Sequence, residues 1–112
     1  QFDRYLRFFE RLVAEGDRLC LGGRLSADLA ILPAPVRDPF RDFSADHLAW
    51  RTELFTAGQA LGVFQRNETP QDQALMLGAA VQGAVQVART RGDADYFRRI
   101  AAQLRRQFLV TP

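Results

Sequence analysis

Few residues in this sequence could do chemistry. It has one histidine, His47, and one cysteine, Cys20, among 112 residues, and its 13 acidic residues are scattered along the chain. General acid–base catalysis and metal binding both need clustered His, Cys, Asp and Glu side chains. No His-Glu-x-x-His, P-loop or Gly-x-Ser-x-Gly motif occurs. The sequence therefore predicts a protein that is not an enzyme and that carries neither a metal ion nor a cofactor.

Arg51 is the most informative charged residue. On a helical wheel it falls inside the apolar arc that contains His47, Trp50 and Leu54, and a charge in such a place needs a partner. Asp28 also falls on the apolar side of its own short helix. One interpretation is therefore a buried ion pair between Asp28 and Arg51.

The other interpretation makes Arg51 a polar anchor in a mostly apolar pocket, together with His47 and Gln82. Such a pocket would bind a small apolar or amphipathic molecule, and Arg51 favours one with an acidic or polar head. The predicted ligand-binding residues are Phe9, Leu25, His47, Trp50, Arg51, Leu54 and Met76.

Helices must position these side chains, because apolar residues recur at helical spacing along most of the chain. The pattern predicts a helix from Phe2 to Ala14 and a short one from Leu25 to Leu32, which stops at Pro33. A third helix is predicted to begin at Asp38-Pro39 and to end near Gly62.

Two further helices are predicted from their capping residues. Thr69 is a suitable N-cap and Pro70 suits the first helical position, so a fourth helix should run to Arg91. Gly92-Asp93 should end it and cap the last helix, which should span Asp93–Leu109. The expected fold is all-α, a bundle of about five helices that forms a single domain over residues 1–112.

The fourth predicted helix is apolar around more than half its circumference, so it should be covered on two sides. Core packing alone could supply that cover. We favour a homodimer in which the last two helices of each chain form a four-helix interface. Its predicted residues are Leu77, Val81, Ala84, Val85, Ala88, Tyr96, Ile100 and Leu104.

The composition is that of a globular domain, with 47% hydrophobic and 25% charged residues. No run approaches the roughly 18 apolar residues that cross a bilayer, and no signal peptide opens the chain. A cytoplasmic protein without membrane contact is expected. All 15 basic residues are arginines and the net charge is only +2, which gives little support to a nucleic-acid surface in these residues.

Three segments resemble TetR-type transcriptional regulators. Residues 19–29, Leu-Cys-Leu-Gly-Gly-Arg-Leu-Ser-Ala-Asp-Leu, are similar to the "gCl-x-g-x-l-x-x-E" segment of that family, with Asp28 at the acidic position. Residues 47–62 resemble its "W…l-x-x-G-x-x-x-G" stretch, and residues 74–93 its "A…a-x-x-G-a-x-x-x-a-r…d" helix. The likeness covers nearly the whole chain in the right order.

This resemblance implies a C-terminal effector-sensing and dimerisation domain. The family's last two helices, here Gln71–Arg91 and Asp93–Leu109, pair across a two-fold axis, and the other helices surround an effector pocket. The family reads operator DNA with an N-terminal helix-turn-helix that has no counterpart in these residues. The alternative is a helical module that docks on another protein and binds no small molecule.

Overall fold

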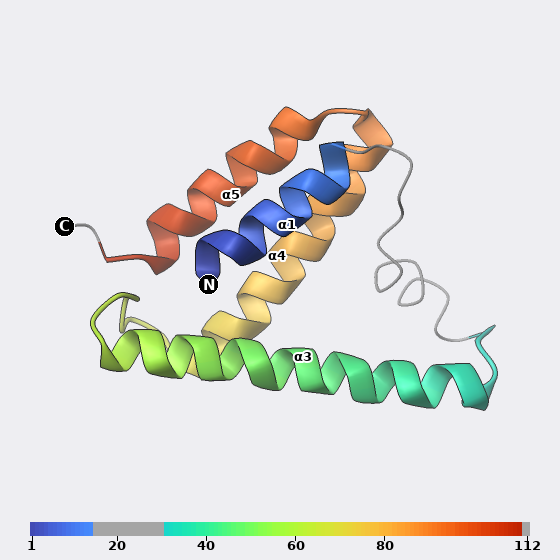
Figure 1. The fold of residues 1–112 in the computed structure, drawn as a ribbon, viewed down its shortest axis with the longest axis horizontal. Helices are drawn as coiled ribbons and strands as arrows, with labels where there is room; N and C mark the ends of the chain where they lie inside the picture. Colours follow the sequence, from blue (N-terminus) through green and yellow to red (C-terminus); the bar gives the residue numbers. More distant parts are fainter. Residues whose placement is uncertain (15–30, 111–112) are drawn as a thin grey trace.

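The computed structural model describes residues 1–14 and 31–110, and in these residues it contains four α-helices and no extended strand (Figure 1). They are α1 (Phe2–Ala14), α3 (Ala34–Ala60), α4 (Pro70–Arg91) and α5 (Ala94–Phe108). The predicted all-α class is confirmed. Leu25, Asp28, Cys20 and most of the predicted short helix lie outside the described residues.

The capping residues predicted for α4 and α5 are confirmed. The Thr69 hydroxyl accepts a hydrogen bond from the backbone N–H of Asp72 at 3.1 Å. Gly92 ends α4 with φ +64°, a left-handed conformation that glycine adopts without steric cost. The Asp93 carboxylate then accepts from the N–H of Asp95 at 3.0 Å, and α5 begins one residue later than predicted.

The predicted start of α3 is wrong by about one turn. The helix begins at Ala34, with Pro33 as its N-cap residue and Pro35 in the first turn, where a missing N–H costs nothing. The backbone N–H groups of Val36 and Arg37 donate to the Pro33 carbonyl and close the first turn. Pro39, predicted to open the helix, lies inside it.

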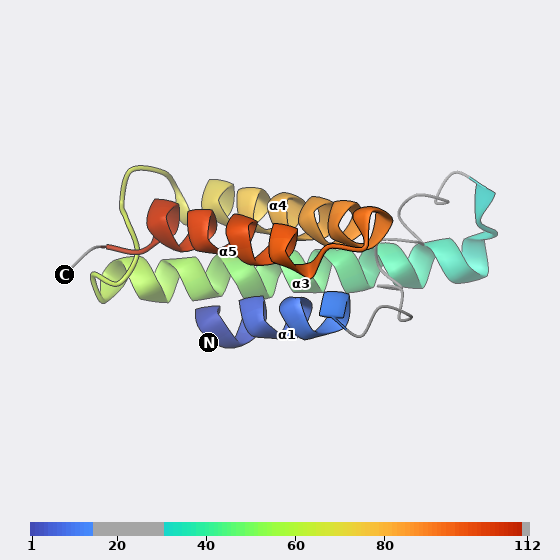
Figure 2. The ribbon, with the colours of Figure 1, turned by 90° about the horizontal axis from the view of Figure 1, so that it is seen from above.

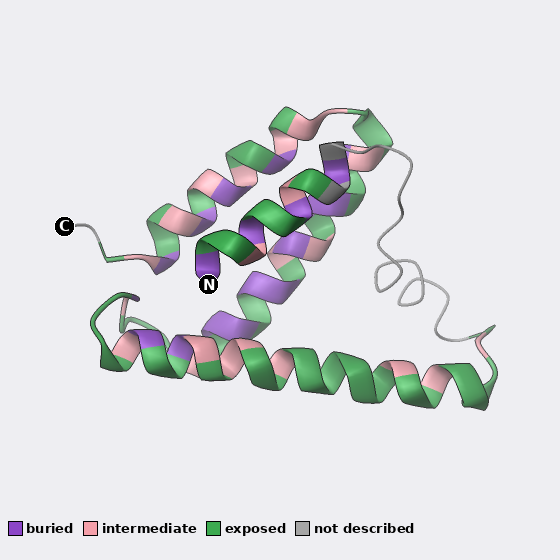
Figure 3. Ribbon diagram, viewed as in Figure 1, coloured by how far each residue is buried: buried purple, intermediate pink, exposed green. Residues whose placement is uncertain are grey.

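α4 is the central helix and contacts α1, α3 and α5. α4 and α5 form an antiparallel pair, α1 lies along both of them, and α3 crosses the first turns of α4 (Figures 1 and 2). Figure 3 shows that the buried side of α4 faces these neighbours and that the first half of α3 is largely exposed. The core consists of Phe2, Leu6, Phe9, Val13, Phe55, Phe64, Ala74, Leu77, Val81, Ala84, Val85, Ala88, Phe97, Ala101, Leu104 and Phe108.

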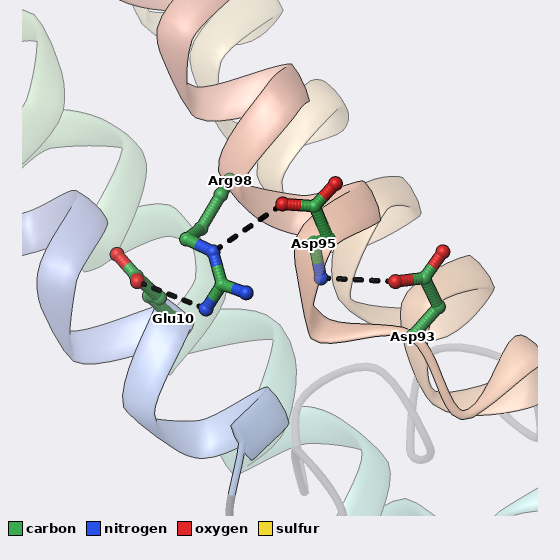
Figure 4. A network of polar contacts seen from close by, with 4 residues as sticks. All are labelled: Glu10, Asp93, Asp95 and Arg98. Atoms are coloured by element: carbon green, nitrogen blue, oxygen red, sulfur yellow. Dashed lines mark hydrogen bonds and ion pairs between the residues drawn. The ribbon is translucent and has the colours of Figure 1, made fainter.

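Two ion pairs join α1 to α5. Arg105 Nε lies 2.8 Å from a carboxylate oxygen of Asp3. Two turns away, Arg98 reaches Glu10 at 3.6 Å while its Nε also approaches Asp95 at 3.6 Å (Figure 4). Such half-exposed pairs each contribute up to about 1 kcal/mol, so they orient α1 more than they stabilise it.

A buried amide holds the connection between α3 and α4. Gln73, only 2% exposed, accepts from Gln59 Nε2 at 2.8 Å and donates to the backbone carbonyl of Gln65 at 2.9 Å. Gln65 donates in turn to the carbonyl of Leu109, next to the antiparallel bridge that pairs Phe64 with Leu109. The buried Gln73 amide is therefore paired at both its oxygen and its nitrogen, and the connection closes one end of the bundle.

Candidate functional site

An aromatic cluster lies where α1 meets α3. The Tyr5 ring is centred 5.0 Å from the Phe9 ring and 5.9 Å from the Trp50 ring. Phe9 is buried, Tyr5 is half-buried, and Trp50 is 42% exposed. The cluster therefore has a buried apolar side, formed by Phe9, and an exposed indole, that of Trp50, which a molecule in solution can contact.

Arg51 lies beside this cluster and reaches across to α4. Its Nε donates to the backbone carbonyl of Ala74 at 3.2 Å. Its guanidinium covers Gly78, where a β-carbon would lie 2.5 Å from Nη2. The predicted need for a partner is therefore met in part by a backbone carbonyl of α4, and the predicted Asp28 partner lies outside the described residues.

The other predicted ligand-binding residues separate into two groups. Leu54 packs against the core one turn from Trp50 and Arg51, and so adjoins the cluster. His47 is exposed and stacks on Phe43, with ring centroids 4.4 Å apart. Met76 lies on the opposite side of α4 from Gly78, so it does not join the others.

Met76 instead lines a hollow of about 480 Å³ at the start of α4. Its 57% exposure shows that no described helix covers it. The residues around the hollow are Asn67, Glu68, Asp72, Gln73, Met76, Gln107 and Phe108.

Two residues at the cluster were not predicted as site residues. Tyr5 joins Phe9 to Trp50, and Gly78 gives Arg51 room on α4. Arg89, three turns farther along α4, is half-buried, and its Nη1 is buried with no hydrogen-bond partner. Spacing could have indicated Arg89, because residues 78, 82, 85 and 89 recur on one side of a helix.

Six of the eight predicted dimer residues are buried inside the single chain. Leu77, Val81, Ala84, Val85, Ala88 and Leu104 are all at most 5% exposed and belong to the core. Tyr96 and Ile100 are half-buried beside it. The six core residues therefore have no free surface to offer to a second chain, and only Tyr96 and Ile100 remain available.

A different side of α4 is largely exposed. Met76, Ala80, Gly83 and Val87 recur at i, i+4, i+7 and i+11, and all of them are exposed or half-buried. A β-carbon at Gly83 would meet no atom within 4 Å. This pairing stripe, as we call these four residues, is small or apolar along its whole length.

Among the residues that the structure describes, no three His, Cys, Asp or Glu side chains lie close enough to hold a metal ion together. No helix in residues 1–14 and 31–110 is both long and apolar enough to cross a membrane.

The fold is that of a solved transcriptional regulator. The chain superposes on NemR of E. coli in its reduced form with a TM-score of 0.82, over 99% of this chain and 59% of the NemR chain, at 21% sequence identity. NemR is a regulator of the TetR type. No protein-family model and no curated protein matches the sequence. The likeness therefore establishes the fold, and the chain spans less than two thirds of the length of NemR.

Proposed function

We propose that this chain is the effector-sensing and dimerisation domain of a TetR-type transcriptional regulator. The observation that carries the proposal is the superposition on NemR, which extends over nearly all of this chain. The all-helical fold and the order of the three TetR-like sequence segments support it. Operator DNA would be bound by a helix-turn-helix outside these 112 residues.

The aromatic cluster supports the sensing part of the proposal. Tyr5, Phe9 and Trp50 present an apolar surface, and Arg51 adds a charged group at its edge. Few polar groups on a mostly apolar wall are typical of small-molecule sites. The effector is therefore proposed to be a small apolar or amphipathic molecule that packs on Trp50.

The pairing stripe supports the dimerisation part. Small residues let two helix backbones approach closely, and Met76 and Val87 add apolar area at 57% and 39% exposure. Tyr96 and Ile100 are half-buried on the neighbouring helix. We therefore move the proposed interface from the core side of α4 to this stripe and the adjoining side of α5, where an isologous contact would form a four-helix interface.

α1 is the proposed link between the two parts. It carries Tyr5 and Phe9 of the cluster, and through Asp3 and Glu10 it also binds α5. An effector that binds one position of α1 better than another would shift the population of dimer arrangements. This coupling is what a regulator of this type needs.

The proposal is tested by the solution mass of the chain, measured by light scattering during size exclusion at falling concentration. We expect a dimer of the 12.7 kDa chain. Val87→Arg should give a folded monomer, because it places a charge within the proposed interface. Val63→Arg is the matched control, since Val63 is similarly exposed, at 48%, but lies outside the stripe. A wild-type monomer at all concentrations would instead favour the protein–protein interaction module.

A further inference from the structure

The exposed side of α4 has a symmetric spacing of residues. Asp72 precedes the pairing stripe by one turn, Arg91 follows it by one turn, and both are exposed. The series is Asp72, Met76, Ala80, Gly83, Val87 and Arg91, with intervals of four, four, three, four and four residues. The spacing is therefore the same in both directions along the helix, and its centre lies between Val81 and Gln82.

The residue types are complementary about that centre. If a second copy lay antiparallel on this side of α4, residues equally far from the centre would meet. The pairs would be Met76 with Val87, Ala80 with Gly83, and Asp72 with Arg91. Apolar residues would then face each other, small residues would do the same, and an acid would face a base. A parallel copy would instead place Asp72 against Asp72 and Arg91 against Arg91, where like charges repel.

The two charges also lie on matching flanks of the stripe. A helix turns by about 100° per residue, so Asp72 lies about 50° to one side of the middle of the stripe and Arg91 about 50° to the other. A two-fold axis perpendicular to α4 reverses both the helix direction and the flank. Asp72 of one copy and Arg91 of the other are therefore brought to the same flank at the same height, and this contact occurs twice.

The surroundings of both side chains suit such a contact. The guanidinium carbon of Arg91 lies 5.6 Å from the centre of the Tyr96 ring, which holds the cation at the edge of the stripe. Asp72 lines the hollow of about 480 Å³ together with Glu68 and Met76, so there is room beside its carboxylate for a long side chain. Within residues 1–14 and 31–110, neither Asp72 nor Arg91 belongs to an ion pair.

We infer that two copies of this chain pair antiparallel along this side of α4, with Asp72 of each copy bound to Arg91 of the other. The inference rests on the proposed dimerisation and specifies its direction, its register and its charged contact. Asp72 and Arg91 also suit the dipole of their own helix, since one lies at its start and the other at its end. The test must therefore separate a contact between copies from an effect within one copy.

Reversal of the two charges makes that separation. Asp72→Arg should weaken the dimer at least about tenfold, because two attractions become two repulsions, and Arg91→Asp should do the same. An equimolar mixture of the two variants should form heterodimers with a Kd within about threefold of the wild type, since each acid again faces a base. A dipole effect within one chain would not be relieved by mixing.

The measurement is light scattering at falling concentration, with thermal unfolding as the check that each variant folds. Asp46→Arg is the matched control, because Asp46 is an exposed acid of α3 and its reversal changes the net charge equally. This control should dimerise like the wild type.

The register is tested separately by cross-linking, in chains that also carry Cys20→Ser. Two cysteines form a disulfide only when their Cα atoms lie within about 7 Å of each other. Met76 of one copy should face Val87 of the other, whereas the two Met76 residues should lie about 16 Å apart along the helix axis. Oxidation of a mixture of Met76→Cys and Val87→Cys chains should give linked heterodimers, identified by intact mass. Met76→Cys alone should give at least about tenfold fewer linked dimers.

Failure of the mixture to restore the dimer, or equal cross-linking of Met76→Cys alone, would overturn the inference. A wild-type dimer that neither reversal weakens would overturn it and leave the proposed dimerisation standing. A wild-type monomer at all concentrations would contradict both. The cysteine variants decide the question if a reversal variant does not fold.

Discussion

The guanidinium of Arg51 lies directly on the backbone of Gly78, where a β-carbon would come within 2.5 Å of Nη2. Arg51 Nε meanwhile holds the Ala74 carbonyl at 3.2 Å. The absence of a side chain at position 78 is therefore what lets an arginine from α3 reach the middle of α4. This contact joins the two helices beside Trp50.

Gly78→Ala should displace the Arg51 guanidinium and yet leave the free energy of unfolding nearly unchanged. Alanine gains about 1 kcal/mol of helix propensity over glycine, and loss of the hydrogen bond to Ala74 costs about the same. Urea denaturation measures the balance, and the emission of Trp50 should shift because its neighbour moves. A loss of several kcal/mol would show that Arg51 cannot move aside.

Gly58→Ala should behave differently, although it is the same substitution in a neighbouring helix. A β-carbon there would run into the ring of Phe64, which is 3% exposed and packed among other rings. Overpacking of this kind costs about 1–3 kcal/mol, more than the propensity gain. The same denaturation experiment should place Gly58→Ala below both the wild type and Gly78→Ala, and equal stabilities would contradict the packing at Phe64.

Gln73→Leu should destabilise the chain by about 1–3 kcal/mol. The substitution keeps the volume roughly constant but leaves the Gln65 carbonyl and the Gln59 amide without their buried partner. Gln71→Leu, two residues earlier at an exposed position, is the control and should change stability by less than about 0.5 kcal/mol. Thermal unfolding of the two variants tests this, and similar melting temperatures would argue against the amide network.

Thr69→Ala should cost about 1 kcal/mol, because the hydroxyl that caps α4 is lost. Thr56→Ala is a fitting comparison. Thr56 is exposed within α3 and its hydroxyl donates to a carbonyl one turn back, so alanine should be neutral or slightly stabilising there. Chemical denaturation distinguishes the two, and a neutral Thr69→Ala would show that the cap adds nothing.

The ends of α4 and α5 could be predicted because single residues encode them. Thr69, Pro70, Gly92 and Asp93 each satisfy or terminate a helix end by local geometry, whatever the rest of the chain does. The start of α3 could not be placed in this way. Pro35 and Pro39 are both acceptable first-turn residues, and only the hydrogen bonds to Pro33 show which one the helix uses.

Hydrophobic periodicity alone did not separate the two apolar sides of α4. Val81 and Val87 are equally hydrophobic, yet Val81 is fully buried in the chain and Val87 is 39% exposed. Periodicity shows that α4 has apolar residues on two sides. It does not show which of these sides is buried by other helices of the same chain. The helical wheel also indicated that Arg51 needs a partner. It could not identify that partner, because no sequence pattern marks a backbone carbonyl such as that of Ala74, which lies one turn from Gly78.

The two ion pairs between α1 and α5 share one spacing. Asp3 and Glu10 are seven residues apart on one helix, and Arg98 and Arg105 are seven apart on the other. If α1 slid along α5 by one turn, the acids would face residues three or four positions from Arg98 and Arg105. These are Ala94, Asp95, Ala101, Ala102, Phe108 and Leu109, and none of them is basic. One axial position therefore satisfies both pairs at once, and a signal that travels through α1 is better carried by a tilt of the helix than by a piston-like displacement.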